Sequence, residues 1–125
     1  MARLLIVDDE QDVRDFAANF FRKRKIDVDT AANGQEAIDK VERVKMDLVL
    51  LDIKMDGMDG IETLKRLKDL DKDMKVIMVT GRKPDDDDSL AQCQQLGAID
   101  YIHKPLELAQ LEQVVLKALH KTKRQ

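Results

Sequence analysis

Acidic side chains gather directly behind an apolar segment near the start of the chain. The segment LLIV at residues 4–7 is followed by Asp8 and Asp9, and a second segment, LVLL at 48–51, is followed by Asp52. If these segments are neighbouring strands, their carboxylates repel one another unless a cation lies between them. Oxygen ligands without His or Cys suit a hard ion. The pattern therefore predicts a Mg²⁺ site, for which Mn²⁺ is the alternative ion.

Two further polar residues follow later apolar segments and have the chemistry of a phosphate site. Thr80 comes after VIMV at 76–79, and Lys104 comes shortly after a mixed segment at 99–102. A hydroxyl, an ammonium group and backbone N–H groups can together surround a phosphoryl group. A carboxylate can then act as the nucleophile, because metal and lysine neutralise the charge that develops on the transferred oxygens. Asp52 is the candidate for this nucleophile.

The segments that precede these residues have the length of β-strands. Three of them are apolar throughout, which is typical of central strands, and the segment at 99–102 is more mixed. A fifth segment, IDVDT at 26–30, alternates apolar and polar residues as an edge strand does. Ligands of parallel sheets bind beyond the carboxyl ends of the strands, where the polar residues named above are found.

Helical spacings of apolar residues separate the strands and follow the last one. The expected buried stripes are Val13, Phe16, Ala17 and Phe20; Ala37, Val41 and Val44; Ile61, Leu64 and Leu67; and Leu108, Leu111, Val115 and Ala118. A weaker stripe comprises Leu90, Cys93 and Leu96. Five β-α units in succession predict an α/β fold, a doubly wound parallel sheet with helices on both faces.

The composition limits the classes of protein that need to be considered. With 125 residues, 43% of them apolar, the chain is long enough for one domain with a real core. Its net charge of −3 does not favour nucleic-acid binding. The single Cys93 cannot form an internal disulfide, and we expect a small buried side chain there. No membrane-spanning run or signal peptide is evident, so we expect a cytoplasmic protein.

Taken together, these residues resemble a response regulator receiver domain along the whole chain. The matching motifs are VDDE at 7–10, LLDIKMDGMDG at 50–60, VTG at 79–81 and YIHKP at 101–105, in the family's order. The resemblance implies a flavodoxin-like fold with the strand order 2-1-3-4-5. The receiver domain would span residues 1–121, and residues 122–125 would be a polar tail or the start of a linker.

The resemblance also implies a phosphorylation-activated switch of a two-component system. Asp52 would accept a phosphoryl group from the phosphohistidine of a histidine kinase or a histidine phosphotransfer protein. Asp8 and Asp9 would hold Mg²⁺ together with Asp52 and the backbone carbonyl of Lys54. Such a chain phosphorylates and dephosphorylates itself, but it is not an enzyme that turns over a free substrate.

Other positions would carry the signal onward. Thr80 and Lys104 would bind the phosphoryl oxygens, and a cis bond between Lys104 and Pro105 would aim the lysine. Tyr101 matches the family's switch aromatic, whose ring turns inward when the threonine moves toward the phosphate. This changes the surface of the fourth helix, fifth strand and fifth helix, on which a downstream protein, a missing effector domain or a second copy of the chain would dock.

Further charged residues near the motifs have two interpretations each. Lys54 and Arg82 would occlude water and lengthen the phosphorylated lifetime, or simply extend into solvent. The acidic run at 84–88 would form a charge-sensitive gate, but we favour a role in capping the following helix. Glu10 suits the first turn of a helix, and contact with metal-bound water is its functional alternative.

Three other classes of protein are alternatives to the switch. A Mg²⁺-dependent phosphohydrolase would use the same aspartyl-phosphate chemistry, but no cap insertion or second acid-base carboxylate is evident. A flavin or nucleotide binder would need glycines or a Ser/Thr cluster after the first strand, which this chain lacks. A phosphate-independent, receiver-like binding module stays as the third alternative.

Overall fold

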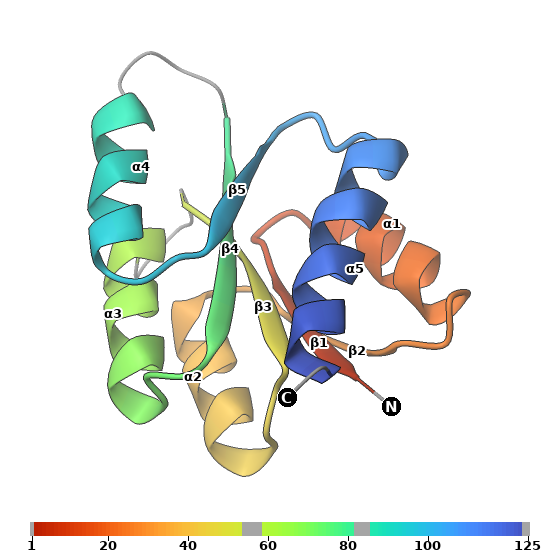
Figure 1. The fold of residues 1–125 in the computed structure, drawn as a ribbon, viewed down its shortest axis with the longest axis horizontal. Helices are drawn as coiled ribbons and strands as arrows, with labels where there is room; N and C mark the ends of the chain where they lie inside the picture. Colours follow the sequence, from red (N-terminus) through yellow and green to blue (C-terminus); the bar gives the residue numbers. More distant parts are fainter. Residues whose placement is uncertain (1, 54–58, 82–85, 124–125) are drawn as a thin grey trace.

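The computed structural model describes residues 2–53, 59–81 and 86–123, and strands alternate with helices throughout them (Figure 1). The strands are β1 (Arg3–Val7), β2 (Asp27–Ala31), β3 (Leu48–Asp52), β4 (Lys75–Thr80) and β5 (Asp100–His103). The helices are α1 (Gln11–Arg22), α2 (Gly34–Arg43), α3 (Gly60–Leu70), α4 (Asp86–Gln95) and α5 (Leu108–Lys123). Among these helices, none is long and apolar enough to cross a membrane.

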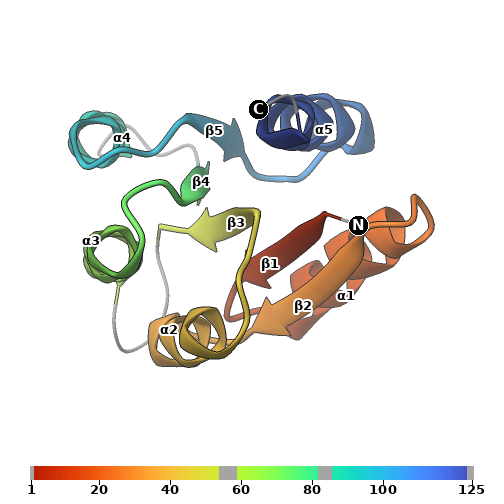
Figure 2. The same cartoon turned by 60° about the horizontal axis from the view of Figure 1, so that its bottom comes forward.

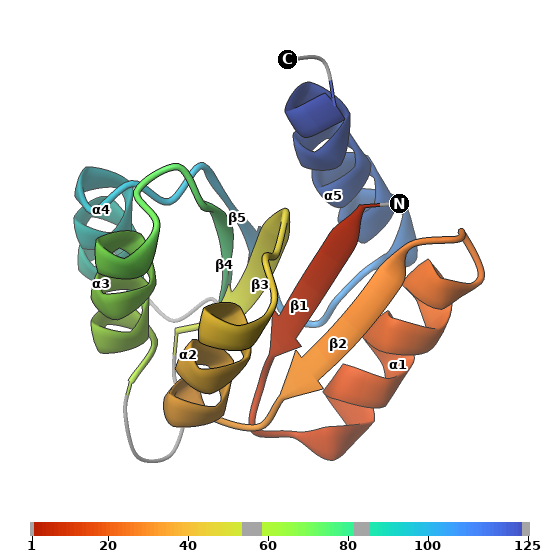
Figure 3. The same cartoon turned by 90° about the horizontal axis from the view of Figure 1, so that it is seen from below.

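The strands form one parallel sheet in the order β2-β1-β3-β4-β5. The predicted α/β class and strand order are thus confirmed. Helices α1 and α5 cover one face of the sheet, and α2, α3 and α4 cover the other, as the view from below shows (Figure 3). β1 and β3 lie side by side in the middle of the sheet (Figure 2). β2 is added to the sheet on one side of β1, and β3, β4 and β5 are added on the other. The strand order therefore reverses between β1 and β3, and a ligand site is expected at such a point.

The central strands are apolar at almost every position because both faces of the sheet are covered. In β1, Leu4 and Ile6 pack with α1 and α5, whereas Leu5 and Val7 pack on the side of α2, α3 and α4. This is the alternation of side chains that a strand imposes. The packing on both faces holds β1 in place, and with it the position of the acidic residues that follow Val7.

Two strands begin one residue later than predicted, at Asp27 and Asp100. For β5 the reason is pairing: the register with β4 starts at Asp100 opposite Ile77. Ile99 donates its N–H to the Val76 carbonyl but lies outside the strand, and 48% of it is exposed. Its apolar character was therefore a misleading sign of the strand start.

The predicted stripe of α1 is also partly wrong. The buried residues of this helix are Ala17, Ala18 and Phe21, whereas Phe16 is 45% exposed. Ala17, Ala18 and Phe21 belong to the apolar cluster between α1, α5 and the sheet, whereas Phe16 lies outside it. In the same way, Val44 and Leu108 are exposed in the structure at the ends of their predicted stripes.

Cys93 of α4 belongs to the apolar cluster between α3 and the sheet. It is 1% exposed, which confirms the expectation of a small buried side chain. Burial, with a smaller contribution from the Asp59 carboxylate, raises the pKa of its thiol to about 11. The thiol is thus protonated at neutral pH and behaves as an apolar group.

Candidate functional site

Polar side chains from several strand ends meet at one edge of the sheet. Asp8 follows β1, Asp52 ends β3 and Thr80 ends β4. These side chains belong to residues that are only 3%, 5% and 1% exposed, respectively. Lys104, directly after β5, is partly exposed at the same edge. Because buried polar groups cost free energy unless they have partners, such a cluster calls for a charge balance within the site.

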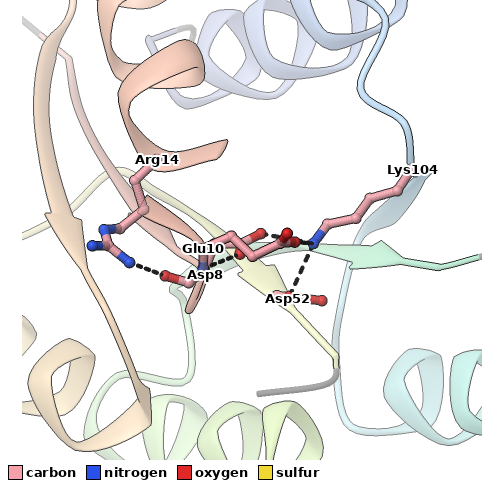
Figure 4. Close-up of polar contacts among 5 residues, drawn as sticks. All are labelled: Asp8, Glu10, Arg14, Asp52 and Lys104. Carbon is pink, nitrogen blue, oxygen red and sulfur yellow. Dashed lines mark hydrogen bonds and ion pairs between the residues drawn. The ribbon is translucent and has the colours of Figure 1, made fainter. Parts of the chain in front are cut away.

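Lys104 supplies that balance, and Figure 4 shows its side chain reaching across the site. Its ammonium nitrogen lies 3.1 Å from Oδ2 of Asp8, 3.1 Å from Oε1 of Glu10 and 3.2 Å from Oδ2 of Asp52. Two of these carboxylates are almost fully buried, while that of Glu10 is largely exposed. The lysine therefore links the ends of β1, β3 and β5.

The charge of Lys104 is stabilised by these contacts. Burial alone would lower the pKa of its ammonium group, but the carboxylate of Asp52 and those of Glu10 and Asp8 outweigh burial and raise the pKa. Lys104 is consequently a fixed cation at neutral pH, held where it can meet an anion.

The backbone around Lys104 is tied to the neighbouring strand. Its N–H donates to the Thr80 carbonyl oxygen at 2.7 Å, and the peptide bond between Lys104 and Pro105 is cis. The last register pair of β4 and β5 is Thr80 with His103. The structure thus brings Thr80 and Lys104 side by side.

Asp8 has partners on its backbone as well as on its carboxylate. Its N–H donates to the Ala31 carbonyl at 3.1 Å, and its Oδ1 accepts from the N–H of Glu10 at 2.9 Å. Its carbonyl oxygen accepts from Nη1 of Arg14 at 2.7 Å. Arg14 was not among the predicted site residues, since a charged residue in an amphipathic helix ordinarily indicates a solvent-exposed face.

The donor set fits a hard divalent cation. Asp8, Asp9 and Glu10 each offer a carboxylate oxygen, and these three atoms lie within 4.8 Å of one another. The carboxylate of Asp52 lies close to them, because it contacts the same Lys104 ammonium group as the carboxylates of Asp8 and Glu10. Carboxylate oxygens are the ligands that Mg²⁺ prefers in proteins. Lys54, whose carbonyl is the further predicted ligand, lies outside the described residues.

Other predicted positions also fall outside the described part of the chain. They are Arg82, the proposed partner of Lys54 in tuning the phosphorylated lifetime, and the first two residues of the acidic run, 84 and 85. The remaining residues of that run, 86–88, are the first three residues of α4. Their role in capping that helix stays a prediction.

Tyr101, the predicted switch aromatic, points outward from β5. It is 38% exposed, and its ring makes an edge-to-face contact with that of His103 at a centroid distance of 5.3 Å. His103 is half-buried. Its Nδ1 finds no hydrogen-bond partner among the described residues. The two rings lie on one face of β5, opposite to buried Ile102.

A mostly apolar hollow borders the site between α1 and the loop that follows β5. The residues that line it are Asp12, Val13, Phe16, Gly81, Lys104, Pro105 and Leu106. The hollow explains the exposure of Phe16, which forms part of its wall. Because Lys104 lies in both the hollow and the polar site, a molecule in the hollow would also reach Lys104.

Comparison with known proteins identifies similar sequences. The family model of the response regulator receiver domain matches residues 4–116. The chain is 38% identical over 117 residues to sporulation initiation phosphotransferase F of Bacillus subtilis, covering 94% of this chain and 93% of that protein. It is 39% identical over 107 residues to a protein-glutamate methylesterase/protein-glutamine glutaminase of Bacillus licheniformis. There it covers 84% of this chain but spans only 30% of that longer protein.

Solved structures show the same arrangement. A CheY-like receiver domain protein from Methanospirillum hungatei superposes with a TM-score of 0.93 at 31% identity, covering 99% of this chain and 98% of that one. The chemotaxis protein CheY4 of Vibrio cholerae gives a TM-score of 0.87 at 25% identity, covering 94% of this chain and 98% of that one.

Proposed function

Because this chain belongs to the response regulator receiver domain family of two-component signalling, we propose that it is a switch with Asp52 as its phosphoacceptor. Membership of this family implies signalling regulated by phosphorylation. One observation carries the finer proposal: the ammonium group of Lys104 lies between the buried carboxylates of Asp52 and Asp8. A carboxylate beside a fixed cation can accept a phosphoryl group, because the charge that develops on the transferred oxygens is neutralised there.

Receiver domains generally bind Mg²⁺, and the acidic cluster of this chain suits it. We assign Asp8, Asp9 and Asp52 as its ligands, with the backbone carbonyl of Lys54 as a further one. The bound ion would be a second cation at the site, beside the ammonium group of Lys104. Mn²⁺ would serve as well.

The proposed phosphoryl donor is the phosphohistidine of a histidine kinase or of a histidine phosphotransfer protein. A carboxylate oxygen of Asp52 forms a bond to phosphorus in line with the phosphorus–nitrogen bond, which breaks. The imidazole, which carries a proton on its other ring nitrogen, leaves as a neutral group with the electron pair of that bond, and an aspartyl phosphate remains. Lys104 then binds a phosphoryl oxygen, and the Thr80 hydroxyl donates to another.

The output would pass through β5. When Thr80 moves toward the phosphoryl group, space opens behind it for the ring of Tyr101 to turn inward from its outward position. This would change the surface of α4, β5 and α5, which a downstream protein, an effector domain or a second copy of the chain would bind. The receiver domain would span residues 1–121 and act in the cytoplasm.

Self-phosphorylation tests the proposal directly. The native chain, Asp52→Asn and the control Asp100→Asn, which removes an exposed carboxylate at the far end of β5, are incubated with acetyl phosphate and Mg²⁺. Intact mass spectrometry then counts the added phosphoryl groups. We expect one group on the native chain and on the control, and none on Asp52→Asn or in the presence of EDTA.

The chemical nature and the consequence of the modification are measured in the same samples. An aspartyl phosphate is cleaved by hydroxylamine, whereas a phosphoserine or phosphothreonine is not. The chain has one tyrosine and no tryptophan, so its fluorescence reports on Tyr101 alone. Addition to Asp52→Asn, or no addition to the native chain, would contradict the proposal and favour a phosphate-independent binding module.

A further inference from the structure

The side chain of Arg14 contacts a backbone atom of the site rather than a side chain of it. Its Nη1 donates to the carbonyl oxygen of Asp8, six residues earlier, at 2.7 Å. Figure 4 shows the side chain extending from α1 to Asp8 on the side opposite to Lys104. Arg14 is half-buried, so this contact is partly shielded from water.

The carbonyl that Arg14 binds lies just beyond the end of the sheet ladder. The register of β1 and β2 ends with Val7 opposite Ala31, and the N–H of Asp8 donates to the Ala31 carbonyl as a last rung. The carbonyl oxygen of Asp8 comes after that rung in the chain and needs a donor of its own. The rigid guanidinium of Arg14 provides one in a defined direction.

This bond orients the residue that follows. The Asp8 carbonyl and the Asp9 nitrogen share one planar peptide group, so a fixed carbonyl direction also fixes the direction in which the Asp9 Cα leaves. The carboxylate of Asp8 is held separately, by the N–H of Glu10 and by Lys104. Arg14 therefore acts on the placement of the Asp9 carboxylate relative to that of Asp8.

Building on the Mg²⁺ site proposed above, we propose that Arg14 is a positioning residue for that cation. By holding the Asp8–Asp9 peptide, it keeps the two carboxylates at the separation that the cation requires. Arg14 thus strengthens cation binding even though it is itself positively charged.

Two effects of Arg14 on cation affinity have opposite signs, so the direction of the measured change shows which effect is larger. Its charge repels a cation, so removal of the charge alone would tighten binding; for a partly exposed charge the gain is at most about fivefold. Its hydrogen bond orients a ligand-bearing peptide, and loss of such an outer contact typically weakens metal binding about 10–100-fold. The second effect is the larger, so the net result of removing Arg14 is weaker binding.

Mn²⁺ serves as the probe, since the free ion gives an electron paramagnetic resonance signal that is lost on binding. The native chain is compared with Arg14→Met, which keeps the length of the side chain but loses charge and donor. Arg22→Met is the matched control, because Arg22 also lies in α1 and donates to a backbone carbonyl, that of Val28 in β2, at 3.1 Å. We expect about tenfold weaker Mn²⁺ binding for Arg14→Met and native affinity for Arg22→Met.

Arg14→Lys separates charge from geometry. It keeps the positive charge that repels the cation but lacks the planar fork that orients the Asp8 carbonyl, so we expect its Mn²⁺ affinity to be no higher than that of Arg14→Met. Thermal unfolding in EDTA establishes that each variant is folded. With acetyl phosphate, the Mg²⁺ concentration for half-maximal phosphorylation should rise in parallel, while the rate at saturating Mg²⁺ stays close to native.

Equal or tighter Mn²⁺ binding by both Arg14 variants would overturn the inference, since it would leave only the charge effect. The same result would leave the proposed function intact if the native chain binds Mn²⁺ and Asp9→Asn does not. If the native chain itself fails to bind, the proposed function and this inference are both wrong.

Discussion

The ammonium group of Lys104 joins carboxylates that would otherwise repel one another. Asp8 and Glu10 come from the loop after β1, and Asp52 comes from the end of β3. At the residue scale, the proposed phosphorylation would therefore give Lys104 a new partner. The lysine balances the carboxylates before phosphorylation, and a phosphoryl oxygen would replace Asp52 as its partner afterwards.

The raised pKa of Lys104 predicts how stability depends on pH. The ordinary lysine pKa of 10.5 applies to the unfolded chain, and the folded pKa is higher. Above pH 10.5 the unfolded chain loses a proton that the folded chain keeps, so the stabilisation by Lys104 is complete below this pH and declines above it. In urea unfolding, the free energy of unfolding of the native chain should therefore fall more steeply with pH above 10.5 than that of Lys104→Met.

The partner of Lys104 offers an independent check on that slope. Asp52→Asn removes the carboxylate whose Coulombic attraction is the largest single cause that raises the lysine pKa. Its unfolding free energy should depend on alkaline pH less steeply than that of the native chain. Identical slopes for the native chain and both variants would show that Lys104 does not couple to these carboxylates.

At the residue scale, the sequence alone proposes that Lys54 and Arg82 occlude water from the phosphoryl group. If both shield the phosphoryl group from water, Lys54→Ala and Arg82→Ala should each speed the loss of phosphate from Asp52 several-fold. Intact mass followed over time after removal of acetyl phosphate measures this rate. Unchanged rates in both variants would mean that the two side chains extend into solvent.

The principal site residues could be predicted because strand ends are visible in the sequence. Asp8, Asp52 and Thr80 each follow an apolar run, and the parallel order brings such positions together. The contacts of Arg14 with the Asp8 carbonyl and of Glu10 with Lys104 could not be predicted. Both depend on the direction in which α1 leaves the sheet, which no local pattern encodes.

At the scale of elements, the start of α3 is pressed against the end of β3. The N–H of Gly60 donates to the Ile53 carbonyl at 2.8 Å. A Cβ atom added at Gly60 would lie 2.3 Å from the carbonyl oxygen of Asp52 and 2.6 Å from the Cα of Ile53. These are backbone atoms that cannot move aside cheaply. A side chain at this position must therefore displace either α3 or Asp52.

Gly60→Ala should accordingly lower stability by about 1–3 kcal/mol, the usual cost of overpacking, and slow phosphorylation of Asp52. Gly81→Ala is the matched control, because a Cβ atom there meets nothing within 4 Å. Its stability should be native or up to about 1 kcal/mol higher. Urea unfolding and the acetyl phosphate assay measure both quantities. Equal stability of the two variants would contradict the close packing of α3 on β3.

At the scale of the whole molecule, the sheet separates two apolar clusters that together hold the strands in place. The cluster under α1 and α5 contains Phe21, which is fully buried, whereas Phe16 on the same helix is 45% exposed. The parallel order was predictable from the alternation of strands and helices. The phase of α1 was not, because neighbouring phenylalanines and alanines permit two buried stripes that differ by one residue.

Phe21→Ala should lower the free energy of unfolding by about 3–5 kcal/mol, as for other large side chains removed from a core. Phe16→Ala is the control and should cost less than about 1 kcal/mol. Urea unfolding monitored by circular dichroism measures both. Similar losses for the two variants would show that α1 packs on the sheet in the other phase.

The burial of Cys93 makes this protein convenient for attaching a dye. The chain has a single cysteine, and thiol reagents react with the thiolate, which is scarce when the pKa is about 11. A new cysteine at an exposed position, such as Asp100→Cys next to Tyr101, would then be labelled alone at neutral pH. The native thiol could stay in place, so one substitution would turn the molecule into an optical sensor of its own phosphorylation.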